Sequence, residues 1–502
     1  MARRAQRKCR SQENRKAPVP ELEVGPSEAL RPPARYACAA SESSVALSTP
    51  EQPLLARVAL FSFKPILDPA GNLAGPAIRP FEMARALAAR GHEVRLLEPE
   101  SASAAAPELS AGAGVDLGRW HPGRSLSPFV RDADLAILPQ ELVGRFTDLG
   151  PVPRVIDLFD PHFVSCLFNQ APHFDAEQAF YYAGKIHDLA RALREGDLFL
   201  CAGGRQRLFY LGMLQLLGRI NPETIREIDR LIRIVPLAAP EGEPAAGPPL
   251  IRGVHCSDDA PIVLWSSGIY PYLDAEIVLD AFLRLRAELP AAQLLFVGAD
   301  NPTAPEMREG YRALRSRVEN ESIQGIHFHP WQPYEERGRI YHEVDVAVAL
   351  SPPHLETELC FRHRIVDLLW GGVPVVVAGG NDLGEWTARE GAARILGEFD
   401  AGALARLLSE ILSDRDKRDA MSRSARAMAE GPLSWERIVG PVDEFCRDPR
   451  PAPDLAARHL GVSLRSVLRI PLTDYRGLLN RARISYHVRG GLAGMLLRRG
   501  RG

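Results

Sequence analysis

The segment 354–377 constrains the fold of this chain more than any other part of the sequence. It opens with two glutamates, continues with two arginines, and leads through an apolar run into Gly-Gly-Val-Pro and a row of valines. The apolar residues of 365–369 have helical spacing, and Asp367 lies off their apolar face. The glycines and the proline end this helix, and 375–377 is typical of a buried strand. Such a loop, helix and strand would place a helix N-terminus beside paired cations, an arrangement suited to a phosphate.

The rest of the chain alternates strand patterns with helix patterns in two arrays. In each array, short apolar strands bounded by turn residues alternate with helical periodicity, the pattern of doubly wound parallel sheets. We therefore predict an α/β protein with two Rossmann-like domains facing across a cleft. The first array has strands at 56–61, 92–97, 135–138, 155–158, 198–202 and 232–235, with a helix at 78–90. The second has strands at 261–265, 293–297, 326–329 and 344–349, with helices at 274–289 and 334–343.

Length and composition fit two domains with tails. The chain has 502 residues, of which 46% are hydrophobic, enough for two sizeable cores. The net charge of −2 gives no general attraction to nucleic acid. Seven scattered cysteines form no Cys-x-x-Cys pair, which favours reduced thiols over disulfides or a zinc site. No apolar run reaches the roughly 20 residues that span a bilayer, and no signal sequence is visible, so we expect a cytoplasmic protein.

Composition also sets the expected domain bounds. The Pro/Gly/Ala-rich stretch 240–249 is the most linker-like part of the middle of the chain. Residues 1–52 have few large apolar side chains, so we expect them to be disordered. We predict a disordered tail (1–52), a first Rossmann-like domain on the acceptor side (53–240), a second that binds the donor (241–430), a closing helix that returns to the first (431–450) and a basic tail (451–502).

The segment 354–377 resembles the donor site of retaining glycosyltransferases of family four, and in particular a bacterial polysaccharide-biosynthesis subgroup. The resemblance rests on His-x-Glu-Thr at 354–357, Phe-Arg-x-Arg at 361–364 and Asp-x-x-Trp-x-Gly-x-Pro at 367–374. It extends over roughly 56–450 through further segments. These are 75–79 (Gly-Pro-Ala-Ile-Arg), 157–161 (Asp-Leu-Phe-Asp-Pro), 205–207 with 211–212, and 435–437 (Trp-Glu-Arg).

The resemblance implies the GT-B fold, and transfer of a hexose from a nucleotide sugar with retention of configuration. The family pattern has two acids, and Asp367 stands where the second belongs. Strict spacing would put the first at Leu359, so the first acid is displaced, and the subgroup pattern assigns it to Glu356. Such enzymes are usually assigned a mechanism without a protein nucleophile, in which the departing phosphate takes the acceptor proton.

Arg362 and Arg364 are the predicted catalytic cations. The diphosphate that leaves accumulates negative charge, and guanidinium groups at a helix N-terminus would stabilise it. The alternative is that each is a surface arginine or pairs with Glu356 or Glu358. We count Glu356 with the arginines as catalytic, because it would hold hydroxyls of the donor sugar; its alternative is a loop carboxylate.

Asp367 is expected to accept hydrogen bonds from the ribose of the donor, or else to interact with the helix dipole. The resemblance adds Phe361 and Glu358 to the donor-binding residues. Ser267 and Gly268, after the first strand of the second array, could offer hydroxyl and N–H donors. No cation lies between Val263 and Arg284, where family members often carry one, so phosphate neutralisation would depend on the two arginines above.

Four residues of the first array are predicted to face the cleft on the acceptor side. Gly75 precedes a helix, and glycine lets a backbone approach a ligand closely. Arg79 lies in the first turn, where a cation opposes the helix dipole, which favours a ligand role. Asp157 and Asp160 follow a strand, where α/β folds bind ligands, although turn capping is the alternative. No further acid or histidine completes a metal site, so we expect no metal and no cofactor.

The tail carries ten arginines and two aspartates, with short amphipathic patterns near 464–468 and 478–479. Attachment to an anionic membrane surface, where lipid-linked acceptors lie, and a solvated tail are both compatible with this composition. The expected partners are a nucleotide-sugar donor and a glycan or lipid-linked acceptor, with no nucleic acid. Two other functions stay open: a nucleotide-sugar epimerase of the same fold, or a catalytically silent nucleotide- or sugar-binding protein.

Overall fold

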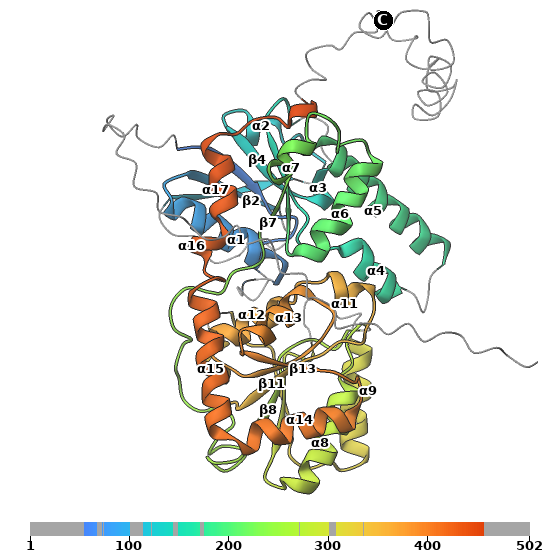
Figure 1. Cartoon of the computed structure of the whole chain (residues 1–502), viewed down its shortest axis with the longest axis vertical. Coiled ribbons are helices and arrows are strands. Elements are labelled where there is room, and N and C mark those ends of the chain that lie inside the picture. Colours follow the sequence, from blue (N-terminus) through green and yellow to red (C-terminus); the bar gives the residue numbers. More distant parts are fainter. Residues whose placement is uncertain are drawn as a thin grey trace, which may run out of the picture. The chain divides into compact units, whose positions relative to one another are not determined.

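The structure is a computed structural model that describes residues 55–455, apart from 68–72, 74, 101–113, 122, 144–148, 171–174, 271, 301–307 and 335. The expectations about the N-terminal tail and about residues 456–502 therefore lie outside the described residues. Within the described part the chain builds two parallel sheets with helices on both sides (Figure 1). We call the elements around the first sheet the first lobe and those around the second sheet the second lobe.

The first sheet has seven strands in the order β3-β2-β1-β4-β5-β6-β7. The order reverses beside β1, which pairs in parallel with both β2 and β4. Ligands of doubly wound sheets bind beside such a reversal, at the carboxyl ends of the strands. The strands are β1 (Arg57–Phe61), β2 (Glu93–Pro99), β3 (Val115–Trp120), β4 (Leu135–Pro139), β5 (Arg154–Asp157), β6 (Leu198–Cys201) and β7 (Ile232–Ile234).

The second sheet has six strands in the order β10-β9-β8-β11-β12-β13, and its reversal lies beside β8. The two sheets confirm the predicted fold class, because both are parallel and doubly wound. The strands are β8 (Ile262–Trp265), β9 (Gln293–Val297), β10 (Ile326–His329), β11 (Val346–Ala349), β12 (Val375–Ala378) and β13 (Ala393–Leu396).

Helices cover both faces of each sheet (Figure 1). The helices between the first-lobe strands are α1 (Gly75–Ala89), α2 (Ser127–Val130), α3 (Gln140–Val143), α4 (His162–Gln170), α5 (Ala176–Glu195), α6 (Gly204–Leu216), the 3-10 turn η2 (Ile225–Glu227) and α7 (Ile228–Leu231). The later helices are α8 (Glu276–Glu288), α9 (Arg308–Asn320), α10 (Gly338–Tyr341), α11 (Leu355–Leu359), α12 (His363–Trp370), α13 (Asp382–Arg389), α14 (Ala401–Ser413), α15 (Arg415–Glu430), α16 (Trp435–Ile438) and α17 (Gly440–Arg447).

The central strands are buried on both faces, which explains their nearly continuous apolar sequences. In β1, Val58 and Leu60 belong to one core cluster while Phe61 belongs to another on the opposite face. In β8, Trp265 and Leu264 divide in the same way between the two clusters of the second lobe. Each lobe therefore has a core layer above and below its sheet.

The end of the described chain packs on the first lobe. Trp435 of α16 and Val442 of α17 belong to the same core cluster as Val58. Beyond α17, Asp454 is 5% exposed and accepts two hydrogen bonds from the fully buried Arg219. The first residues of the segment predicted as a basic tail are thus fixed to the first lobe.

Two predicted elements have different bounds. The helix predicted at 78–90 begins at Gly75, because proline near a helix start has no N–H to leave unpaired, although Gly-Pro suggests a loop in a sequence. Of the helix predicted at 334–343, only Gly338–Tyr341 is helical. A side chain at Gly338 would meet the backbone of Ala245 and Pro244, so glycine permits this close approach at the expense of a longer helix.

Candidate active site

Helix α11 begins at a histidine cap. His354 Nδ1 accepts a hydrogen bond from the Thr357 N–H at 3.1 Å, so its Nε2 carries the hydrogen and donates to the Tyr272 carbonyl at 3.3 Å. The His354 ring also packs on Phe168 of α4, with ring centroids 4.3 Å apart. These contacts give His354 the role of a cap that orients α11 and the glutamate within it.

Glu356 and Arg362 form a bidentate ion pair. Glu356 is 1% exposed; Arg362 Nη1 donates to its Oε1 at 2.8 Å and Nη2 contacts its Oε2. The Arg362 guanidinium also lies 5.2 Å from the centre of the Tyr272 ring. The salt bridge considered as the alternative for Arg362 is therefore present, and both oxygens of Glu356 already accept from it.

Arg364 and Asp367 lie on the first two turns of α12. Arg364 Nη1 is 3.9 Å from Asp367 Oδ2, too long for a hydrogen bond, and the guanidinium lies 5.1 Å from the Trp331 ring centre. Asp367 is 6% exposed, whereas the Arg364 side chain is 25% exposed. Arg364 therefore keeps hydrogen-bond donors that Asp367 does not use.

Arg337 is a site residue that the sequence analysis missed. It is 8% exposed, donates from Nη2 to Asp367 Oδ1 at 3.2 Å, and lies between the rings of Tyr334 and Trp370. Burial, the largest single influence, disfavours its charge, but the Asp367 carboxylate together with Tyr334 and Tyr341 outweighs burial and raises the pKa of Arg337 above its ordinary value. Nothing in the spacing of the sequence indicates this contact, because Arg337 precedes a short helix 30 residues from Asp367.

A pocket brings Arg337, Arg364 and Asp367 together with the carboxyl ends of the second-lobe strands, whereas Glu356 and Arg362 are not among its lining residues. Ser266, Gly298 and Trp331 follow β8, β9 and β10, and Gly75 of α1 completes the lining from the first lobe. The described residues that line it are Leu73, Gly75, Ile78, Ser266, Val297, Gly298, Trp331, Gln332, Tyr334, Arg337, Ile340, Tyr341, His363, Arg364 and Asp367. Gly75, Arg364 and Asp367 are the predicted site residues among them.

The other predicted donor residues, Ser267, Gly268, Phe361 and Glu358, are not among the residues that line this pocket. The Ser267 carbonyl accepts from the Trp265 indole at 2.9 Å, and a side chain at Gly268 would meet the Tyr270 ring. Phe361 is buried in the second-lobe core, and Glu358 is exposed. Their donor contacts stay predictions.

Arg79 and Asp157 are partners of each other. Arg79 Nε and Nη2 donate to the two Asp157 oxygens at 2.7 and 3.0 Å, and the guanidinium also donates to the carbonyls of Val235 and Pro236. It lies 4.4 Å from the Phe159 ring centre. These contacts tie α1 to β5 and to the chain after β7, and they occupy every guanidinium nitrogen of Arg79.

Acidic groups gather at the carboxyl ends of β4 and β5. Asp160 is an exposed residue by surface area, but loss of hydration beside the surrounding protein atoms and, after it, the Glu356 charge raise its pKa to about 6. Burial raises the pKa of Glu141 to about 7. Gln140 is 6% exposed and donates to the Asp160 carbonyl at 2.7 Å. This edge of the first lobe therefore carries carboxyl groups that hold protons more readily than usual.

His363 opens α12 and lines the pocket. Burial and the adjacent Arg364 lower the pKa of its imidazole to about 4. The ring is therefore neutral near pH 7, and it can donate from one nitrogen and accept at the other.

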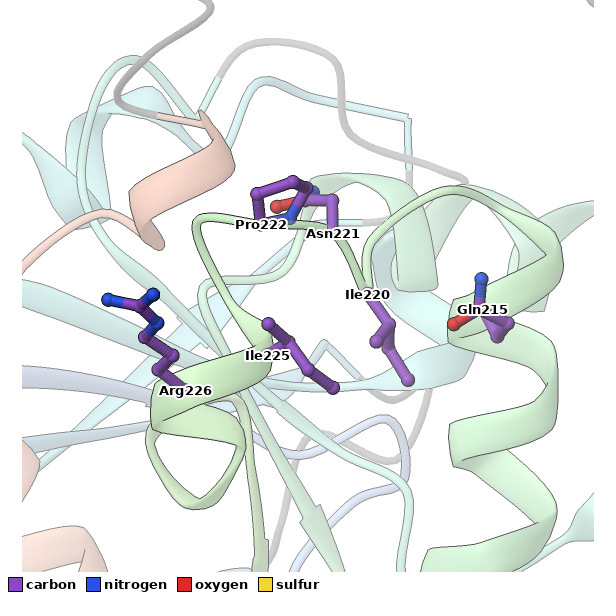
Figure 2. A pocket seen from close by; sticks show the side chains of 6 residues that line it. All are labelled: Gln215, Ile220, Asn221, Pro222, Ile225 and Arg226. Carbon is purple, nitrogen blue, oxygen red and sulfur yellow. The ribbon is translucent and has the colours of Figure 1, made fainter.

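A second hollow lies elsewhere in the first lobe, between the end of α6 and η2 (Figure 2). Its lining contains none of the predicted site residues and one charged side chain, that of Arg226. The lining residues are Gln215, Ile220, Asn221, Pro222, Ile225 and Arg226. We therefore place the candidate active site in the pocket of Arg364 and Asp367.

Metal and membrane features can be stated for the described residues. In that part of the chain, no group of three or more His, Cys, Asp or Glu side chains is placed to hold a metal ion. Within the same residues, none of the helices combines the length and apolar character needed to cross a bilayer. The described cysteines are free thiols: Cys166, Cys201, Cys256, Cys360 and Cys446. That the reaction needs no cofactor stays a prediction.

The second lobe matches a known family. Residues 260–414, which include Arg364 and Asp367, match the family described as Glycosyl transferases group 1. The chain is a glycosyltransferase. Its two parallel, doubly wound sheets are those of the GT-B fold, as the sequence analysis predicted. No curated protein matches the glycosyltransferase by sequence.

Solved structures share the fold of this glycosyltransferase at low identity. Sucrose-phosphate synthase from Thermosynechococcus elongatus is 17% identical with a TM-score of 0.53, covering 81% of this chain and 100% of that chain. HepE from Anabaena, solved with UDP and glucose, is 13% identical with a TM-score of 0.54, covering 78% and 99%. WaaG, a glycosyltransferase involved in lipopolysaccharide biosynthesis, is 15% identical with a TM-score of 0.51, covering 78% and 100%.

Proposed function

We propose that this glycosyltransferase moves a hexose from a nucleoside-diphosphate sugar to a hydroxyl of a glycan, glycolipid or polysaccharide, with retention of configuration. One observation carries the proposal: Arg364 and Asp367 line one pocket, side by side but not hydrogen-bonded. A cation and an acceptor in one pocket are complementary to a diphosphate joined to a ribose. The complexes of HepE with UDP and glucose, in the same fold, support this class of donor.

Arg364 would stabilise the charge of the leaving diphosphate. As the glycosidic bond stretches, negative charge grows on the phosphate oxygens, and a fixed guanidinium counteracts it most in the transition state. Arg362 provides no side-chain cap to α12, so the N–H groups of the first turn and the positive end of the helix dipole would add to this stabilisation. His363 would remain uncharged beside them and act as a hydrogen-bond donor.

Asp367 and Glu356 would hold the two sugars of the donor. Asp367 Oδ2 is free of close hydrogen bonds to the described residues around it, so it can accept from the ribose hydroxyls. Glu356 keeps lone pairs beyond those that face Arg362, and these would accept from the hexose. In this scheme the departing phosphate receives the acceptor proton, so no protein nucleophile is needed.

The acceptor would approach from the first lobe. Asp160 lies within electrostatic reach of Glu356 and Arg362, so the edge that carries Asp160 and Glu141 is near residues that we propose bind the donor. A carboxyl group that is partly protonated near neutral pH can both donate to and accept from a sugar hydroxyl. We propose that Asp160 contacts the acceptor, whereas Asp157 and Arg79 keep the strand end in place.

The direct test is a panel of nucleotide sugars with the purified full-length protein, with release of free nucleoside diphosphate as the readout. We expect one donor to give release that rises when an acceptor glycan or glycolipid is added. Conversion of the donor to another nucleotide sugar without acceptor would indicate an epimerase. Tight binding of a nucleoside diphosphate without turnover in any acceptor mixture would indicate a silent binding protein.

We also propose that the basic tail attaches the enzyme to an anionic membrane surface. Ten arginines against two aspartates in 451–502 favour such a surface. The test compares the full chain with a chain that ends at residue 455, so that the buried Asp454 is kept. Loss of sedimentation with phosphatidylserine vesicles on truncation is expected, and unchanged sedimentation would rule the attachment out.

A further inference from the structure

We propose that Arg337 is a positioning residue that fixes the Asp367 carboxylate for the nucleotide ribose and thereby leaves Arg364 free for the diphosphate. The inference rests on the proposed function, because it takes Asp367 as the ribose acceptor. It assigns a role to a residue that lies outside the segment 354–377.

The first step is that Asp367 needs a compensating cation. Its carboxylate is 6% exposed, and burying a charge without a partner is costly. Two guanidinium groups are near it: Arg337 at hydrogen-bond distance, 3.2 Å from Oδ1, and Arg364 at 3.9 Å from Oδ2. Within the part of the chain that the structure describes, only Arg337 has a contact short enough to orient the carboxylate.

The second step is that Arg337 is itself held in one place. Its guanidinium carbon lies 3.5 Å from the Tyr334 ring centre and 4.8 Å from the Trp370 ring centre, and Nη1 donates to the Tyr334 carbonyl. The Trp370 indole donates to the Gly242 carbonyl at 2.7 Å, which fixes that ring in turn. A planar cation between two aromatic rings keeps its orientation and its charge at low exposure.

The third step is a division of roles between the two arginines. Because Arg337 binds Oδ1, the other oxygen of Asp367 is available to ribose hydroxyls. Arg364 is then not needed to neutralise Asp367 and can turn its donors toward phosphate oxygens. Without Arg337, the nearest remaining cation among the described residues is Arg364, and we expect it to move toward Asp367.

The position of Tyr334 extends the argument to the first lobe. The Tyr334 hydroxyl is 3.5 Å from Glu82 Oε1 of α1, at the limit of a hydrogen bond. Burial raises the pKa of Glu82, so the protonation state of this carboxyl group also depends on its surroundings. A chain of contacts therefore links Glu82 of α1 to Tyr334, Tyr334 to Arg337, and Arg337 to Asp367.

The test measures preference for ribose. Calorimetry gives the Kd of the nucleoside diphosphate that wild-type protein binds best and of its 2′,3′-dideoxy analogue. We expect wild type to prefer the ribose form about tenfold or more, and Asp367→Asn to lose that preference. Arg337→Gln should lose it too, and it should also weaken binding of the dideoxy analogue, because Arg364 then turns from the diphosphate toward Asp367.

Two further variants complete the design. Arg337→Lys keeps a charge but not the planar group between the rings, so we expect it to lose part of the preference, which also covers the case in which Arg337→Gln does not fold. Arg339→Gln is the matched control: Arg339 lies two residues further on, contacts Glu336 and the Pro248 carbonyl, and should leave the preference unchanged.

The outcomes separate this inference from the proposed function. If Asp367→Asn loses the ribose preference but both Arg337 variants keep it, the role of Arg337 is wrong and the donor site stands. If Asp367→Asn keeps the preference, the assignment of Asp367 to the ribose fails, and the inference fails with it.

Discussion

Arg219 and Asp454 form a buried ion pair although 235 residues separate them in the chain. The Arg219 side chain is 0% exposed and that of Asp454 4%; Nε donates to Oδ2 at 2.6 Å, and Nη1 donates to the Leu193 carbonyl. The pair joins the last described residues to the loop after α6, so it fixes the point from which the basic tail leaves the first lobe.

Removing one member of this pair should destabilise the fold. Asp454→Ala leaves the Arg219 charge buried without its partner, and we expect the free energy of unfolding to fall by about 3–5 kcal/mol. Urea unfolding monitored by circular dichroism measures it. The control is Asp448→Ala, whose ion pair with Arg450 is exposed and should be worth less than about 1 kcal/mol. Equal losses in the two variants would contradict the argument.

Replacing Arg364 should affect the reaction far more than the fold. Its side chain is one-quarter exposed and makes no short ion pair to a described residue, so Arg364→Gln should change the free energy of unfolding by less than about 1 kcal/mol. Loss of a preorganised cation at the leaving group should lower kcat by about 100- to 1,000-fold. Steady-state release of nucleoside diphosphate gives kcat and KM. A change confined to KM would argue for a role in ground-state binding only.

Replacing Arg362 should affect the fold as well as the reaction. Arg362→Gln leaves the 1% exposed Glu356 without its bidentate partner, so we expect both activity and stability to fall, the latter by about 3 kcal/mol. Thermal unfolding of the Arg362 and Arg364 variants side by side distinguishes the two arginines. If the Arg362 variant unfolds at the same temperature as the wild type, the ion pair with Glu356 contributes little to the stability of the fold.

The pKa of Glu141 gives a prediction about pH. Because burial raises that pKa to about 7 from the ordinary 4.5, the folded protein keeps a proton that the unfolded chain has already lost between these values. The contribution of Glu141 to stability is therefore present at low pH and is lost as pH rises through about 7. Glu141→Gln removes this loss.

At about pH 8 we expect Glu141→Gln to have a free energy of unfolding roughly 1–2 kcal/mol above that of the wild type, and therefore to unfold at a higher temperature. The difference should shrink as the pH falls toward about 4.5, where the wild-type carboxyl is protonated in both states. Thermal melts across this range measure it. A gain that grows toward acid pH would have the wrong sign for a carboxyl group whose pKa is raised in the folded protein.

The first lobe meets the second through Arg205. It donates to Asp382 and Glu385 of α13, and its own backbone N–H donates to Asp382 at 2.8 Å. Helix α6 has no side-chain cap from its own N-cap residue, Gly203, so Asp382 supplies that acceptor from the other lobe. A side chain at Gly203 would meet the Asp382 carboxylate.

Gly203→Ala should therefore push Asp382 away and weaken this contact between the lobes. We expect KM for the donor to rise severalfold with little change in thermal stability, because the groups are about one-third exposed and screened. The control is Gly212→Ala on the same helix, where a side chain would meet no neighbouring atom. Equal KM values for the two variants would contradict the proposed contact.

Periodicity was enough to predict the two sheets and the loop–helix–strand unit at 354–377. Strands such as β1 and β8 are buried on both faces, so their apolar runs are conspicuous. The edge strands β3 and β13 were missed; half of the residues of β3 are exposed, among them Asp116 and Arg119. An edge strand lacks the burial that produces a clear pattern.

The placement of the candidate site residues could be predicted where they are close in sequence, and their roles stay predictions. Arg362, Arg364 and Asp367 follow one another in one segment, and the structure places all three at the start of α12. The partners of these residues could not be read from spacing, because Arg337 comes from another element. Pairings such as Arg79 with Asp157, 78 residues apart, depend on strand order, which a single sequence does not specify.

The return of α16 and α17 to the first lobe means that the chain cannot be cut into two independent pieces at a single point. A fragment ending before Trp435 would leave the side chains around Val58 and Leu87 facing water, and expressing it alone should yield aggregates. Isolating the first lobe requires either its own last helices supplied as a second peptide or a circularly permuted gene that joins them to the end of β7.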